Sequence, residues 1–261
     1  MIIDFHMHGF PDELAEKALA TLSGRCGIPP STDGTLTGIK ASMKAAGISR
    51  GILLSIATRP SQNESILRWA ASLRDDSLIA FGSLHPGHPD AVSQVQQAAQ
   101  LGLKGIKFHP DYQDFYVDDK AVFPVYEKAC REGLIMIFHA GVDIGLPGPV
   151  HCTPERMRRV VDAFPGARII AAHMGGFQCW DEAEHCLVGT DVYMDTSFSI
   201  PWMQKDQFFR MISRHDPRKI LFGTDTPWSS QAVEVEQFLS LDLAEEIKRG
   251  ILCENAMELL A

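Results

Sequence analysis

The sequence predicts an α/β protein folded as a single (β/α)8 TIM barrel over residues 1–261, and three observations support this fold class. Short apolar, β-branched segments recur along the whole chain and alternate with longer segments of helical periodicity. Continuous apolar strands separated by helices are typical of a parallel sheet that helices cover. Eight such units in 261 residues match the size of a (β/α)8 barrel.

The expected strands share an apolar centre and turn residues at their ends. They are residues 2–6, 51–56, 78–84, 105–109, 134–139, 168–173, 191–196 and 219–224. The expected helices are amphipathic, and several begin at a capping residue, such as Thr153 before Pro154. They include residues 12–22, 61–73, 90–101, 121–131, 153–164 and 233–239. Residues 24–35 are rich in Gly, Pro and Ser and are expected to form a loop.

A doubly wound sheet is the alternative architecture. Such a sheet usually carries a glycine-rich phosphate turn after an early strand, whereas here the first strand runs into "HGFPDE". The chain has no repeat of fixed period, no low-complexity tract and no long linker, so one domain is expected.

Charge and composition exclude several classes of partner. The net charge of −9, without any run of Lys or Arg, argues against nucleic acid and against an anionic membrane surface. No apolar run approaches the roughly 20 residues that a membrane span needs, and the N-terminus lacks the features of a signal peptide. A cytoplasmic protein is therefore expected. The six cysteines form no CxxC pair, which argues against a zinc knuckle or a redox dithiol.

The first expected strand, "IIDFHMH", carries polar residues at alternate positions. Asp4, His6 and His8 are two residues apart, so in a regular strand their side chains share one face. Because the active site of this barrel lies at the carboxyl ends of the strands, His6 and His8 are expected at its mouth, facing inward.

Other strands also end in residues that can bind a metal. His109, His139 and His173 close the fourth, fifth and sixth strands, and Asp225 follows the eighth. A single histidine at a strand end is more often structural, but this set would converge on one point. Imidazole and carboxylate ligands suit Zn, Mn, Fe or Ni, and a catalytic ion keeps one position open for water.

Taken in order, these motifs resemble the amidohydrolase superfamily. The segments are "DFHMH", "KFHPD", "FHAG", "AHMGG", "FGTDTPW" and the closing "ILCENAMELL". They are most similar to the amidohydrolase-2 branch, which also contains enzymes like aminocarboxymuconate-semialdehyde decarboxylase. The resemblance covers essentially the whole chain, and it is the ordered set, rather than any one motif, that is specific.

The resemblance implies a metal centre and roles for its residues. His6, His8, His139 and Asp225 would bind one divalent metal, with Zn expected first and Mn, Fe or Ni as alternatives. Asp225 would also accept a proton from the water bound to that metal. His173 would polarise the substrate or relay a proton.

The fourth strand leaves two interpretations open. Lys107 and His109 share a face, and "IKFHPD" resembles the segment of binuclear amidohydrolases in which a carboxylated lysine bridges two metals. Alternatively, Lys107 is a buried cation that binds a substrate carboxylate or pairs with Asp4 or Asp195. His109 is then a substrate contact or an additional ligand.

Weaker candidates lie in the loops. Arg59 could pair with an anionic group of the substrate, and Trp228 could pack at the rim or stack on a substrate ring. His85 and His88 are expected to shape a turn and a helix start.

The resulting prediction is a metal-dependent hydrolase that attacks an amide, ester or lactone carbonyl of a small molecule. The alternative is a non-oxidative decarboxylase of a carboxylated ring or an unsaturated acid, which would use the same ligands. A non-catalytic scaffold would have lost at least one core residue, and all of them are present. Nothing in the sequence identifies an interface, although barrels of this kind often form homo-oligomers.

Overall fold

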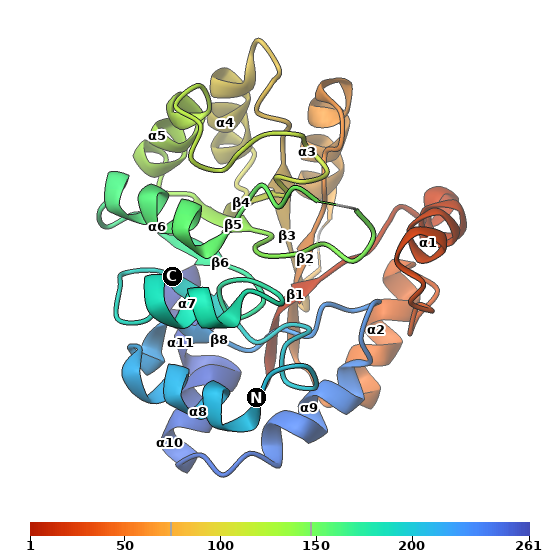
Figure 1. The fold of residues 1–261 in the computed structure, drawn as a ribbon. Helices are drawn as coiled ribbons and strands as arrows, with labels where there is room; N and C mark the ends of the chain where they lie inside the picture. Colours follow the sequence, from red (N-terminus) through yellow and green to blue (C-terminus); the bar gives the residue numbers. More distant parts are fainter. Residues whose placement is uncertain (74, 147) are drawn as a thin grey trace.

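The computed structural model describes residues 1–73, 75–146 and 148–261, which form a (β/α)8 TIM barrel (Figure 1). Its eight strands are parallel and lie in chain order, and each pairs with the next. They are β1 (Ile3–Met7), β2 (Arg50–Leu54), β3 (Leu78–Ser83), β4 (Gly105–Phe108), β5 (Ile135–Phe138), β6 (Ile169–Ala171), β7 (Tyr193–Asp195) and β8 (Ile220–Leu221). The backbone N–H of Phe5 donates to the carbonyl of Phe222 at 2.7 Å, which joins the last strand segment to the first. The predicted fold class is confirmed.

Helices surround the strands (Figure 1). They are α1 (Asp12–Cys26), α2 (Leu36–Ala45), α3 (Asn63–Ser72), α4 (Ala91–Gln100), α5 (Phe123–Arg131), α6 (Pro154–Ala163), α7 (Trp180–Cys186), α8 (Lys205–Arg214), α9 (Gln231–Leu239), α10 (Glu245–Arg249) and α11 (Asn255–Leu260). Short 3₁₀ turns lie at Pro60–Gln62 and Pro217–Lys219, and a π-helical turn lies at Gly250–Glu254. Within the described residues, no helix combines the length and the apolar character that crossing a membrane requires.

The prediction of a loop at residues 24–35 is wrong for its first residues. Helix α1 continues to Cys26, and Gly27 ends it in the left-handed conformation, at φ 71°. The N–H of Gly27 donates to the carbonyl of Ser23 at 2.8 Å, which satisfies one of the last helix carbonyls. The loop ends at Thr35, whose side-chain oxygen caps α2 by accepting the N–H of Gly38.

The apolar core has two parts, as the alternation of side chains along a barrel requires. The larger part packs the outward side chains of the strands against the helices. The smaller part fills the barrel interior, where the rings of Phe5 and Phe81 meet edge to face at 5.9 Å. This interior plug closes the barrel below its carboxyl end and leaves the polar residues above it.

Strand β1 departs from regular alternation, and this corrects the expectation that Asp4 shares a face with His6 and His8. The register with β2 shifts between Asp4 and Met7. The side-chain amide of Gln231 on α9 donates to Asp4 Oδ2 at 2.9 Å and also contacts Met7 Sδ. Asp4 and Met7 therefore both face helix α9, whereas Phe5 and His6 both point inward.

Candidate metal centre

His8 presents a free imidazole nitrogen to Asp225. Its Nδ1–H donates to the carbonyl of Leu54 at 2.8 Å, so a neutral His8 ring carries a lone pair on Nε2. That Nε2 lies 3.1 Å from Oδ1 of Asp225. Two acceptor atoms thus face each other at the end of β1.

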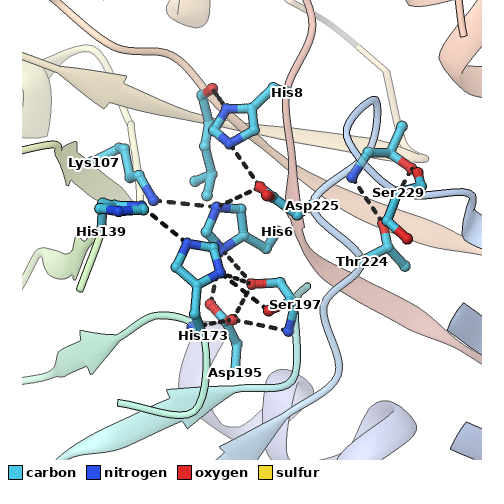
Figure 2. A network of polar contacts seen from close by, with 12 residues as sticks. His6, His8, Lys107, His139, His173, Asp195, Ser197, Thr224, Asp225 and Ser229 are labelled. Atoms are coloured by element: carbon cyan, nitrogen blue, oxygen red, sulfur yellow. Dashed lines mark hydrogen bonds and ion pairs between the residues drawn. The ribbon is translucent and has the colours of Figure 1, made fainter. Parts of the chain in front are cut away.

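His6 meets the same carboxylate oxygen from below (Figure 2). Its Nδ1–H donates to Asp195 Oδ2 at 2.9 Å, and its Nε2 lies 3.3 Å from Asp225 Oδ1. Burial, reinforced by the charge of Lys107, holds the pKa of His6 well below its usual value. The ring is therefore neutral and presents its Nε2 lone pair, which is the form that binds metals.

The donor set at this point fits a divalent metal ion. His6, His8 and Asp225 each offer one ligand atom, and these three atoms lie within 4.8 Å of one another. All three residues are buried. Three converging acceptors repel one another unless a cation lies among them, and imidazole with carboxylate suits Zn, Mn, Fe or Ni. Burial acts to raise the pKa of Asp225, but the close contacts with His8 and His6 lower it overall, so the carboxylate is ionised.

The backbone near Asp225 brings this residue over the first strand. Asp225 adopts the left-handed conformation, at φ 67°, and its N–H donates to the carbonyl of His6 at 2.8 Å. Gly223 leaves room for His6, because a Cβ atom at Gly223 would lie 2.9 Å from Cβ of His6. Asp4 holds the same segment from the outer side by accepting the hydroxyl of Thr224 at 2.6 Å.

His139 and His173 form a pair next to this cluster. The Nδ1 of His173 lies 3.1 Å from the carbonyl of Ser197, which places its proton there and leaves Nε2 as an acceptor. The Nδ1–H of His139 then donates to His173 Nε2 at 3.0 Å. The Nε2 atom of His139 is buried and has no partner among the described residues, so it is open to a ligand.

Asp195 and Ser197 position the histidines of the centre, whereas the sequence analysis considered Asp195 only as a partner of Lys107 and gave Ser197 no role. Besides His6, Asp195 accepts the backbone N–H groups of His173 and Ser197, each at 3.1 Å. The hydroxyl of Ser197 contacts Asp195, His6 Nδ1 and His173 Nδ1. Their only signal in the sequence was "MDTS" at the end of the seventh strand. A carboxylate behind a metal-binding histidine orients the ring and raises its basicity.

Lys107 lies inside the centre and is not part of an ion pair within the described residues. Its Nζ lies 3.2 Å from His6 Nε2 (Figure 2). Burial lowers the pKa of Lys107 to about 8, against the opposing effect of the Asp195 and Asp225 charges. The predicted pairing with Asp4 is wrong, because Asp4 faces α9, and Asp195 is engaged by His6 instead.

His109 is oriented by a carboxylate that the sequence analysis did not select. Its Nδ1 accepts the backbone N–H of Tyr112 at 3.3 Å, which places the ring proton on Nε2, 3.2 Å from Asp143 Oδ2. The ring stacks on His139 with centroids 4.1 Å apart. His109, His139 and Asp143 form a second group with metal-ligand spacing.

A cavity of about 870 Å³ opens above these residues. The predicted residues that line it are His8, Lys107, His109, His139, His173, Asp225, Arg59 and Trp228. His6 lies beneath them and is fully buried. Arg59 is an exposed residue of the cavity wall, and Trp228 is half-buried next to Asp225, whose carbonyl accepts its N–H at 2.9 Å.

His85 and His88 lie outside the cavity lining and shape the turn before α4, as expected. The Nδ1 of His85 accepts the N–H of Gly87, and the Nδ1 of His88 accepts the N–H of Asp90.

Comparison with solved structures shows the same fold. An uncharacterized TIM-barrel protein of Bordetella bronchiseptica is 22% identical, over 99% of this chain and 98% of its own, with a TM-score of 0.82. The 5-carboxyvanillate decarboxylase of Novosphingobium aromaticivorans, solved with manganese, is 17% identical over 100% and 96% of the two chains, with a TM-score of 0.73. The 2,6-dihydroxybenzoate decarboxylase of Rhizobium is 19% identical over 99% and 98%, with a TM-score of 0.71.

The family is shown by the sequence model described as Amidohydrolase, which matches residues 3–261. None of the curated proteins compared with the chain matches it. The family match covers all eight strands and every residue of the candidate centre. The chain belongs to the amidohydrolase family.

Proposed function

We propose that this protein is a metal-dependent hydrolase that uses an activated water to attack an amide, ester or lactone carbonyl of a small molecule. The observation that carries the proposal is the convergence of His6 Nε2, His8 Nε2 and Asp225 Oδ1 beneath a cavity. His139, which lies beside these residues and has metal-ligand spacing with His109 and Asp143 rather than with them, is the proposed fourth ligand. A divalent ion at this point would lower the pKa of a bound water and polarise a carbonyl oxygen.

Asp225 is the proposed base in this reaction. Its carboxylate is ionised and lines the cavity, so it can accept the proton that the attacking water loses and return it to the leaving group. Its position is fixed by the contact with His8 and by the backbone bond to His6. A base held in this way acts without first having to reorganise.

His173 is the proposed second proton-handling residue. It lines the cavity, and the bond from its Nδ1 to Ser197 leaves Nε2 as an acceptor, which would have to exchange the Nδ1–H of His139 for a proton at the substrate. Once protonated, it can donate to the oxygen on which negative charge develops. Asp195, through the backbone N–H of His173, holds the ring in place.

Decarboxylation of a small carboxylic acid is the second candidate, and two observations favour it. Two of the similar structures are decarboxylases, one of them solved with manganese. In addition, the amine of Lys107 lies in the cavity, next to His6, where it can pair with a substrate carboxylate. Asp225 and His173 would then deliver a proton to carbon.

The metal assignment is tested by elemental analysis of protein purified without chelator and with bicarbonate present. We expect His6→Ala and Asp225→Ala to lose most of the bound metal, whereas His185→Asn, at an exposed position on α7, keeps it. Full occupancy in both alanine variants would remove the ligand assignment. Two ions per chain would indicate a carboxylated Lys107 bridge and favour hydrolysis, and one ion would leave Lys107 free for substrate.

The reaction class is tested with two substrate panels, each assayed with and without a chelator. One contains esters, lactones and amides, with acid release as the signal. The other contains hydroxylated aromatic acids, with CO₂ release as the signal. Chelator-sensitive acid release that Asp225→Asn abolishes supports hydrolysis, whereas chelator-sensitive CO₂ release alone replaces it with the second candidate.

A further inference from the structure

The cavity has a polar floor, and its outer part combines apolar side chains with a few polar ones, among them Lys17, Thr21 and Arg25 of α1. We propose that this outer part binds an elongated apolar group, an acyl chain or an equivalent hydrocarbon body, attached to the reacting carbonyl or carboxyl group. We define the outer chamber as Leu14, Ala18 and Leu22 of α1 together with Ile66 and Trp69 of α3. The inference names a substrate class for the site and to that extent rests on the proposed function.

Helix α1 contributes a stripe of apolar residues that the core does not use. Leu14, Ala18 and Leu22 are spaced four residues apart and therefore lie on one face. The helix attaches to the core through other positions, since its buried residues are Ala15 and Leu19. The stripe is exposed or half-buried, and all three of its members line the cavity.

Helix α3 presents a second apolar pair to the same cavity. Ile66 and Trp69 are three residues apart and half-buried, and Trp69 also packs against the core, in which Leu67 and Ala70 are buried. The chamber is continuous with the floor, because Asp225 lines the same cavity. A substrate that places its reacting group at Asp225 would extend its remainder between the apolar side chains of α1 and α3.

The size of the cavity and the exposure of its walls favour a large apolar occupant. Its volume of about 870 Å³ lies toward the upper end of the range for small-molecule sites, roughly 300–1,000 Å³. Leu14 is 55% exposed and Ile144, another wall residue, is 42% exposed. Apolar side chains left exposed within a concave site gain free energy when an apolar ligand covers them.

The test measures binding and requires no turnover. Acetate, hexanoate and decanoate are titrated into the purified protein by calorimetry. We expect affinity to rise about two- to fourfold per added methylene until the chamber is filled, as burial of each CH₂ group predicts. Affinity that is independent of chain length would overturn the inference.

A matched pair of substitutions tests whether the ligand binds in the outer chamber. Ala18→Phe fills the chamber, whereas Ala20→Phe adds the same side chain at an exposed position of α1 outside the cavity lining. We expect Ala18→Phe to weaken decanoate binding at least tenfold while leaving acetate binding unchanged, and Ala20→Phe to alter neither. Equal effects of the two variants would overturn the inference. If Ala18→Phe fails to fold, Ile66→Asn, from the opposite wall, replaces it.

The outcomes separate this inference from the proposed function. Chain-length-dependent binding without any hydrolysis leaves the chamber assignment standing and removes the hydrolase. Hydrolysis of short and long substrates at equal rates, with equal affinities, supports the hydrolase and removes the chamber assignment. Sedimentation of the same variants tests whether a second copy of the chain occupies the chamber instead. If Ala18→Phe dissociates an oligomer while decanoate binding is unaffected, the chamber is a contact between copies of the chain and the inference fails.

Discussion

Oδ2 of Asp195 lies 2.9 Å from Nδ1 of His6, and both residues are fully buried. This contact keeps the ring proton of His6 on Nδ1 and turns the Nε2 lone pair toward Asp225. The same carboxylate accepts the N–H of His173. Asp195 therefore orients two histidines that line or underlie the cavity.

Asp195→Asn is expected to lower metal affinity about 10- to 100-fold, because an amide supports the His6 proton less well than a carboxylate does. Competition with a metallochromic chelator measures the affinity. Asp191→Asn, at a half-exposed ion pair with Lys219 ahead of the same strand, is the control and should bind as the parent protein does. Unchanged affinity in Asp195→Asn would show that this carboxylate does not tune the centre.

Gly223→Ala is expected to displace His6, since the added Cβ would lie 2.9 Å from Cβ of that residue. We predict reduced metal content and a loss of about 1–3 kcal/mol in the free energy of unfolding. Gly24→Ala is the control, because no heavy atom of the residues that the structure describes lies within 4 Å of a Cβ placed there. Normal metal content in Gly223→Ala, measured by elemental analysis, would contradict the predicted displacement.

His173→Asn is expected to keep the metal and to lose turnover. The asparagine removes the imidazole nitrogen that faces His139, and the loss of a proton-handling group lowers kcat roughly 10²- to 10⁴-fold. The measurement combines metal analysis with kcat on any substrate found in the panels above. His185→Asn again serves as the matched control. Undiminished kcat would remove the proposed proton role of His173.

Glu234→Gln is expected to stabilise the protein at alkaline pH. Burial raises the pKa of Glu234 to about 8 from an unfolded value of 4.5, so the folded state holds its proton more tightly. The contribution of protonated Glu234 to the free energy of unfolding is present in full below about pH 4.5 and is lost as pH rises through about 8. Relative to the parent, the variant should gain on the order of 3 kcal/mol at pH 8 and little at pH 5.

Denaturant unfolding at the two pH values measures this difference. Glu236→Gln changes an exposed carboxylate on the same helix and should show no such pH dependence. An equal gain at both pH values would mean that Glu234 is ionised in the folded protein throughout this range.

The sequence alone determined the barrel and most of the residues of its centre. Strands of five to seven residues with an apolar centre and turns at both ends have few other stable arrangements when helices alternate with them. The carboxyl ends of parallel strands meet at one edge, so the positions of His8, His139, His173 and Asp225 at strand ends already predicted a common cavity.

Only the tertiary structure decided which carboxylate accepts the ring proton of His6. Alternation placed Asp4 with His6 and His8, but the irregularity in β1 turns Asp4 toward α9. Asp195, 189 residues further along the chain, meets His6 instead. Local spacing specifies a face only while a strand pairs regularly, and nothing in the residues of β1 reveals where its partner forces a bulge.

The tertiary structure also decided the shape of the cavity. The period of α1 shows that Leu14, Ala18 and Leu22 share a face, but not whether that face packs in the core or stands over the strand ends. That choice depends on where the helix lies across the cavity from α3. The physical reason is general: sequence periodicity reports the geometry of one element, whereas a site is made by the distances between elements.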